Sequence, residues 1–101
     1  MDVILDIDHA CRVGHIGYMR KYVEDGGDVN AVDVDGVWLL IQAIRYGQKD
    51  AVIFLIDNGA DVHMRDSDGY TTLHYACYFG CYDVVTYITS SVNYIVNKLH
   101  Y

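Results

Sequence analysis

The stretch Asp68-Gly69-Tyr70-Thr71-Thr72-Leu73-His74-Tyr75-Ala76 contains the signals that decide the fold. It continues a turn that begins at Asp66, because aspartate favours turns and Gly69 adopts the positive φ that other residues avoid. Thr71 is placed to cap a helix over residues 72–79, and Gly80 ends that helix. The sequence therefore predicts a turn, a short helix and a glycine stop in close succession.

The same signals recur along the chain with a constant step. A step of 33 residues joins Gly14, Gly47 and Gly80, joins Ala10, Ala43 and Ala76, and joins Asp50 to Asp83. Apolar side chains at helical spacing predict further helices over 39–46, 49–57 and 82 to about 90. Self-similarity at a fixed period of this length indicates a repeat architecture.

With these motifs in place, the chain resembles the ankyrin repeat family. The resemblance rests on residues 68–76, close to the family's turn followed by Thr-Pro-Leu-His-x-Ala, and on the unit ends at 58–62 and 27–31; it covers about residues 2–91. It implies an all-α solenoid of stacked helix-turn-helix units joined by β-turn or hairpin loops. The implied single domain spans residues 1–101, with repeats at about 1–32, 33–65 and 66–98, of which the first and last are cap-like.

Three departures from the family pattern are clear. Residues 38–41 read Trp-Leu-Leu-Ile where the family has Thr-Pro-Leu-His, so the helix cap is missing in the middle unit. Thr72 stands where proline is usual. The segment 92–101 lacks the Gly-Ala-Asp ending, and its apolar spacing predicts a prolonged closing helix, with the start of a further repeat as the alternative.

Composition excludes several classes of function. The chain has 101 residues, 52% of them hydrophobic, and no proline, which argues against a disordered segment and a large enclosed catalytic cavity. Its formal net charge of −7 argues against nucleic acid and anionic membranes, and favours a protein partner with a basic surface. Three cysteines and an N-terminus unlike a signal peptide predict an intracellular, cytoplasmic protein, with the nucleus as the alternative.

Three residue groups suggest chemistry, but the repeat register favours a structural interpretation of each. His74, Cys77 and Cys81 have a spacing found in zinc sites, yet a fourth ligand is lacking nearby and Cys77 falls at a core position. Cys77, His74 and Asp83 together suggest a cysteine nucleophile, which a packed core would not activate. Residues 66–69 begin like a calcium loop but lack its later acidic ligands. We therefore expect no metal, no cofactor and no catalysis.

The resemblance implies recognition through the turn tips and the exposed side of the first helix in each unit. Carried over individually, the candidate partner-binding residues are Arg12, Val34, Asp35, Val37, Arg45, Tyr46, Arg65, Ser67, Asp68, Tyr70, Tyr78 and Phe79. Tyrosine and arginine are favoured anchors of interfaces. The alternative is that these rings merely cover a short helix stack. Trp38 is assigned mainly to packing, with a turn-tip anchor as its alternative.

Residues 28–31 look like the segment of ankyrin repeats that asparaginyl hydroxylases modify, although Tyr22 replaces the leucine of that pattern. Asn30 is therefore a candidate for hydroxylation, and the alternative is that its amide serves hydrogen bonding in the turn.

The expected function is a non-catalytic protein–protein interaction module. It would bind a protein partner, as a monomer, through its concave face and turn tips, and act as an adaptor or a stoichiometric inhibitor. The alternative is a structural fragment of a longer ankyrin-repeat array without its own partner site.

Overall fold

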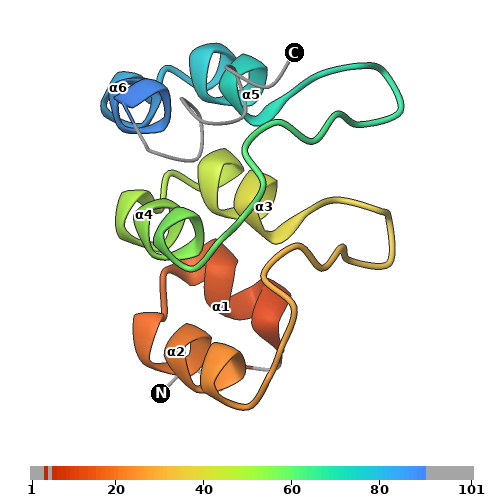
Figure 1. Cartoon of the computed structure of the whole chain (residues 1–101), viewed down its shortest axis with the longest axis vertical. Helices are drawn as coiled ribbons and strands as arrows, with labels where there is room; N and C mark the ends of the chain where they lie inside the picture. Colours follow the sequence, from red (N-terminus) through yellow and green to blue (C-terminus); the bar gives the residue numbers. More distant parts are fainter. Residues whose placement is uncertain (1–3, 5, 91–101) are drawn as a thin grey trace.

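The computed structural model describes residues 4 and 6–90, which form three helical hairpins (Figure 1). The helices are α1 (Ile7–Val13), α2 (Ile16–Glu24), α3 (Leu39–Arg45), α4 (Lys49–Asp57), α5 (Thr72–Tyr78) and α6 (Tyr82–Ser90). Helices α1, α3 and α5 stack in one column, and α2, α4 and α6 form a second column beside it. The predicted all-α solenoid is confirmed. No helix in the described part of the chain is long and apolar enough to cross a membrane.

The helix bounds agree closely with those predicted. Helices α4 and α6 begin and end at the expected residues, whereas α3 and α5 end one residue early. The reason is that Tyr46 and Phe79 serve as C-caps, directly before the glycines that follow. Gly80 has a φ of 71°, in the left-handed region where a side chain is disfavoured. The segment 92–101, predicted as a closing helix or a further repeat, lies outside the described residues.

Helices α3 and α5, which each follow a hairpin loop, begin in different ways. In α5, the Thr71 side chain accepts from the backbone N–H of His74, while Nδ1 of His74 accepts from the backbone N–H of Thr71, so a capping box is formed. Trp38 precedes α3 and, within the described chain, makes no side-chain cap hydrogen bond, as its sequence predicted. Burial stabilises α3 instead, because every residue from Leu39 to Ile44 is buried.

The connections into α3 and α5 are short hairpin loops. Each contains one isolated antiparallel bridge, between Val32 and Trp38 in the first and between Arg65 and Thr71 in the second. Both loops project to the same side of the stack, away from the column of α2, α4 and α6 (Figure 1). The predicted turns are thereby confirmed, and their tips lie on one face of the molecule.

The core lies between the two columns and runs along the stack. Ala10, Ala43 and Ala76 are each fully buried, and their small side chains let helices α1, α3 and α5 approach their neighbours closely. Leu55 of α4 and Ile88 of α6, in the second column, are also buried. Burial of each such large apolar side chain stabilises the fold by about 1.5–3 kcal/mol relative to exposure.

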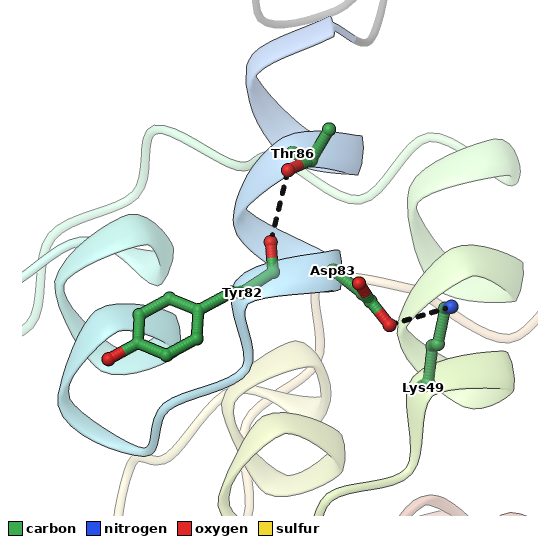
Figure 2. Close-up of polar contacts among 4 residues, drawn as sticks. All are labelled: Lys49, Tyr82, Asp83 and Thr86. Carbon is green, nitrogen blue, oxygen red and sulfur yellow. Dashed lines mark hydrogen bonds and ion pairs between the residues drawn. The ribbon is translucent and has the colours of Figure 1, made fainter.

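Polar contacts join successive hairpins at the loops between paired helices. Nε2 of Gln48 donates to the backbone oxygen of Arg12 at 3.0 Å. Between the second and third hairpins, Nζ of Lys49 lies 3.2 Å from Oδ2 of Asp83, at the start of α6 (Figure 2). Both side chains of this ion pair are more than half exposed, so its contribution to stability is small.

Candidate functional site

The turn before α5 is organised by the carboxylate of Asp66. Its Oδ1 accepts from the backbone N–H groups of Asp68 and Tyr70, each at 2.9 Å. Its Oδ2 accepts from the phenolic hydroxyl of Tyr75, which belongs to α5. The turn interpretation of this segment is therefore confirmed, and the turn is attached to the helix that follows it.

The aromatic side chains around this turn pack edge to face. The ring of Tyr70 lies 5.6 Å from that of His74 and 6.2 Å from that of Tyr75, at interplanar angles of 66° and 77°. The rings of Tyr78 and Phe79 are 5.0 Å apart at 85°. Such arrangements are favourable because the positive edge of one ring meets the negative face of another. Each of these contacts favours the observed ring orientation by about 0.5–1.5 kcal/mol.

These rings surround a depression that we call the aromatic hollow, of about 340 Å³. Its lining residues are Asp68, Tyr70, His74, Tyr75, Tyr78 and Phe79. The exposed fraction is 51% for Tyr70, 83% for Tyr78 and 42% for Phe79. Contiguous exposed aromatic surface of this kind is uncommon on monomers and marks interaction sites.

A second depression, the turn groove, lies between the two hairpin loops and has a volume of about 380 Å³. It is lined by Asp35, Gly36, Val37, Trp38, Ile41, Arg65, Asp66, Ser67 and Tyr75. Because Tyr75 lines both depressions, the aromatic hollow and the turn groove are adjacent. Trp38 is half-buried and lines the turn groove, and its assignment to packing stays a prediction.

The structure brings together two groups of the sequence-predicted residues. Asp68, Tyr70, Tyr78 and Phe79 line the aromatic hollow, whereas Asp35, Val37, Arg65 and Ser67 line the turn groove. Arg12, Val34, Arg45 and Tyr46 belong to neither set of lining residues. Val34 is fully exposed at its turn, and Tyr46 is 53% exposed after α3.

Sequence reasoning missed His74 and Tyr75 as members of the site. The available signal for His74 was its spacing from Tyr78, which lies four residues later and so on the same side of α5. Tyr75 had no such signal, since its position is fixed by the bond to Asp66 across the turn.

The hydrogen bond between Tyr75 and Asp66 sets the charge state of these two residues beside the aromatic hollow. The bond from Tyr75 is the main cause that lowers the pKa of Asp66 below its ordinary 3.8, with backbone N–H donors adding to the effect. The same bond raises the pKa of Tyr75 to about 12. The proton therefore stays on the tyrosine, and Asp66 stays negatively charged.

A family model described as ankyrin repeats, in three copies, matches residues 7–98. The chain belongs to the ankyrin-repeat family. A search of the curated proteins finds no match for it. Ankyrin repeats are generally protein–protein interaction modules, and the family is generally non-catalytic.

One cysteine of this ankyrin-repeat chain differs from its expected placement. Cys77 was expected in the core, and this was wrong, because its side chain is exposed. Its counterpart one repeat earlier, Ile44, is buried beneath the next hairpin, but no described hairpin follows α6 to cover Cys77. Cys11 is buried, and burial raises the pKa of its thiol to about 12. Among residues 4 and 6–90, no group of three or more His, Cys, Asp or Glu side chains is arranged to hold a metal ion.

Asn30 makes a contact between ankyrin repeats. Its Oδ1 accepts from the backbone N–H of Asp61 at 2.8 Å, and its own backbone N–H donates to Oδ1 of Asp28 at the same distance. The side-chain amide therefore does form a hydrogen bond, but the bond joins two units and is not within the turn, where the alternative placed it. Hydroxylation of Asn30 stays a prediction.

Proposed function

We propose that this chain is a non-catalytic protein-binding module whose partner docks on the face formed by the hairpin tips and the inner helices α1, α3 and α5. The observation that carries the proposal is the aromatic hollow. Tyr78 exposes 83% of its surface there, beside two further rings that are more than 40% exposed. Tyrosine is enriched among the residues that dominate binding energy, because it brings a large contact area with a polar end.

Charge supports a basic surface on the partner. The formal net charge of −7 steers a positively charged protein toward the chain and weakens that attraction as salt rises. The turn tips contribute Asp35 and Asp68 to this field, and each lines one of the two depressions. A monomeric module of this kind would act as an adaptor or as a stoichiometric inhibitor, since it works by occupying its partner's surface.

Affinity capture from an extract of the source cells tests the proposal. The bait is the full chain, compared with a variant carrying Tyr70→Leu and Tyr78→Ala and with the matched variant Tyr82→Ala. Tyr82 is 71% exposed at the start of α6, beside the Lys49–Asp83 pair, and does not line the aromatic hollow (Figure 2). Circular dichroism establishes that all three proteins keep their helices.

We expect a protein that the wild type and Tyr82→Ala capture in equal amounts and the double variant loses. Light scattering of the purified complex should give one partner molecule per chain. If all three proteins capture a partner in equal amounts, the aromatic hollow is not part of the binding site. Self-association of the chain without any partner would instead favour a segment of a longer array.

A further inference from the structure

The walls of the aromatic hollow combine two kinds of chemistry. Five of its six lining residues carry rings, and the sixth is the carboxylate of Asp68. Among the described residues that line it there is no lysine and no arginine. The lining therefore presents ring surface and a negative charge together.

The imidazole in this wall is held by a backbone hydrogen bond. Nδ1 of His74 accepts from the backbone N–H of Thr71 at 3.0 Å. Beneath the wall, Asp66 stays ionised through its bond from Tyr75. Two carboxylates thus lie in or behind the aromatic hollow.

Ring faces carry a negative quadrupole, so they attract a cation placed over them, and a nearby carboxylate adds to that attraction. An anion would be repelled by Asp68. A volume of about 340 Å³ is close to the lower limit of ligand pockets, which suits one side chain rather than a large ligand.

We infer that the aromatic hollow receives the guanidinium of an arginine on a basic segment of the partner protein, stacked on the rings of Tyr70 and Tyr78 and paired with Asp68. This inference rests on the proposed function. Arginine fits better than lysine because its planar head is weakly hydrated, stacks on aromatic faces and can pair with a carboxylate through two parallel bonds. The adjacent turn groove has two carboxylates, Asp35 and Asp66, and one guanidinium, Arg65, in its lining, so its charge is negative on balance where such a segment would lie.

Titration calorimetry with synthetic peptides tests the inference. The probes are a Gly-Ser peptide with three spaced arginines, the same peptide with lysines, and the same peptide with citrulline, which has nearly the shape of arginine without its charge. We expect the arginine peptide to bind at least about tenfold more tightly than the citrulline peptide and several-fold more tightly than the lysine peptide.

Variants separate the aromatic hollow from general attraction to an acidic protein. Tyr70→Leu, Tyr78→Ala and Asp68→Asn should each weaken binding of the arginine peptide by about five- to tenfold. Two matched controls, Tyr82→Ala and Asp50→Asn, change exposed residues outside the lining and should alter the affinity by less than about twofold.

Equal binding of the arginine and citrulline peptides overturns the inference, and so does equal weakening by the aromatic-hollow variants and their controls. Lysine binding as tight as arginine binding overturns the assignment of a guanidinium. These results are distinguishable from failure of the proposed function. Suppose that capture of a partner depends on Tyr78, but that all arginines of this partner can be replaced by glutamine without loss of binding. The proposed function as a binding module then stands, and the inference of a bound arginine is wrong.

Discussion

The phenolic hydroxyl of Tyr75 donates to Oδ2 of Asp66, and the other oxygen of that carboxylate accepts from two backbone N–H groups of the turn. One carboxylate thus shapes the turn and attaches it to α5. One repeat earlier, Asp33 makes the same arrangement with Gln42 in place of the tyrosine. The third repeat therefore has a titratable donor where the second has a neutral amide.

Replacing Tyr75 with phenylalanine removes this bond while leaving the ring, and we expect the free energy of unfolding to fall at neutral pH. The folded pKa of Asp66 is lowered, so its contribution is complete above the unfolded value of 3.8 and is lost as pH falls through the lower folded value. The folded pKa of Tyr75 is raised from 10.0 to about 12, so its contribution is complete below pH 10 and is lost as pH rises toward 12. Urea unfolding of both proteins across pH measures the difference.

The stability difference between the wild type and Tyr75→Phe should be widest between about pH 4 and pH 10 and narrow on both sides. Tyr70→Phe is the matched control, since it removes a hydroxyl from the same aromatic hollow and leaves the bond to Asp66 intact. Parallel curves for the wild type and Tyr75→Phe at every pH would contradict the role given to this bond.

Gly14 and Gly47 occupy equivalent positions but differ in what surrounds them. Both have positive φ, 75° and 70°, so alanine is strained at either site by about 1 kcal/mol. A Cβ on Gly14 would also lie 2.6 Å from Oε1 of Gln48, whereas one on Gly47 meets no described atom within 4 Å. To avoid the clash, Gln48 must move and give up its bond to the backbone oxygen of Arg12, which costs about another 1 kcal/mol.

We therefore expect Gly14→Ala to lower the free energy of unfolding by about 2 kcal/mol and Gly47→Ala by about 1 kcal/mol, measured by urea unfolding. In a Gln48→Ala background the two glycine substitutions should lower the free energy of unfolding by the same amount. A persistent difference in that background would mean that the contact with Gln48 is not its cause.

The sequence predicts those parts of the fold that depend on neighbouring residues. Gly80 ends a helix and Thr71 caps one through contacts within a few residues, so both features could be located without the structure. Four of the six residues that line the aromatic hollow were among the predicted ones, and Tyr75 was not, because it is placed by a bond across the turn. Cys77 was misplaced for a related reason: burial at that position depends on the hairpin that packs next, not on the repeat register.

The column of α2, α4 and α6 contributes much of the buried apolar surface. A substitution of Leu55, in α4, measures how much this burial stabilises the fold. Its side chain is 2% exposed and belongs to the main core cluster. Leu55→Ala should lower the free energy of unfolding by about 2–5 kcal/mol, because the lost contacts and the remaining cavity both cost stability. Val34→Ala, at a fully exposed turn residue, should change it by less than about 0.5 kcal/mol. Similar urea midpoints for the two variants would contradict the described packing.

The bond between Oδ1 of Asn30 and the backbone N–H of Asp61 joins the ends of two successive repeats. Asn30→Ala removes the acceptor, and we expect it to lower the free energy of unfolding by about 1 kcal/mol and to speed hydrogen exchange at the Asp61 amide. Asn30→Asp keeps an acceptor oxygen in place and should preserve more of that protection. If the Asp61 amide exchanges at the same rate in the wild type and Asn30→Ala, the contact does not hold in solution, and coupling between these repeats must come from the apolar core and from contacts such as that of Gln48 with Arg12.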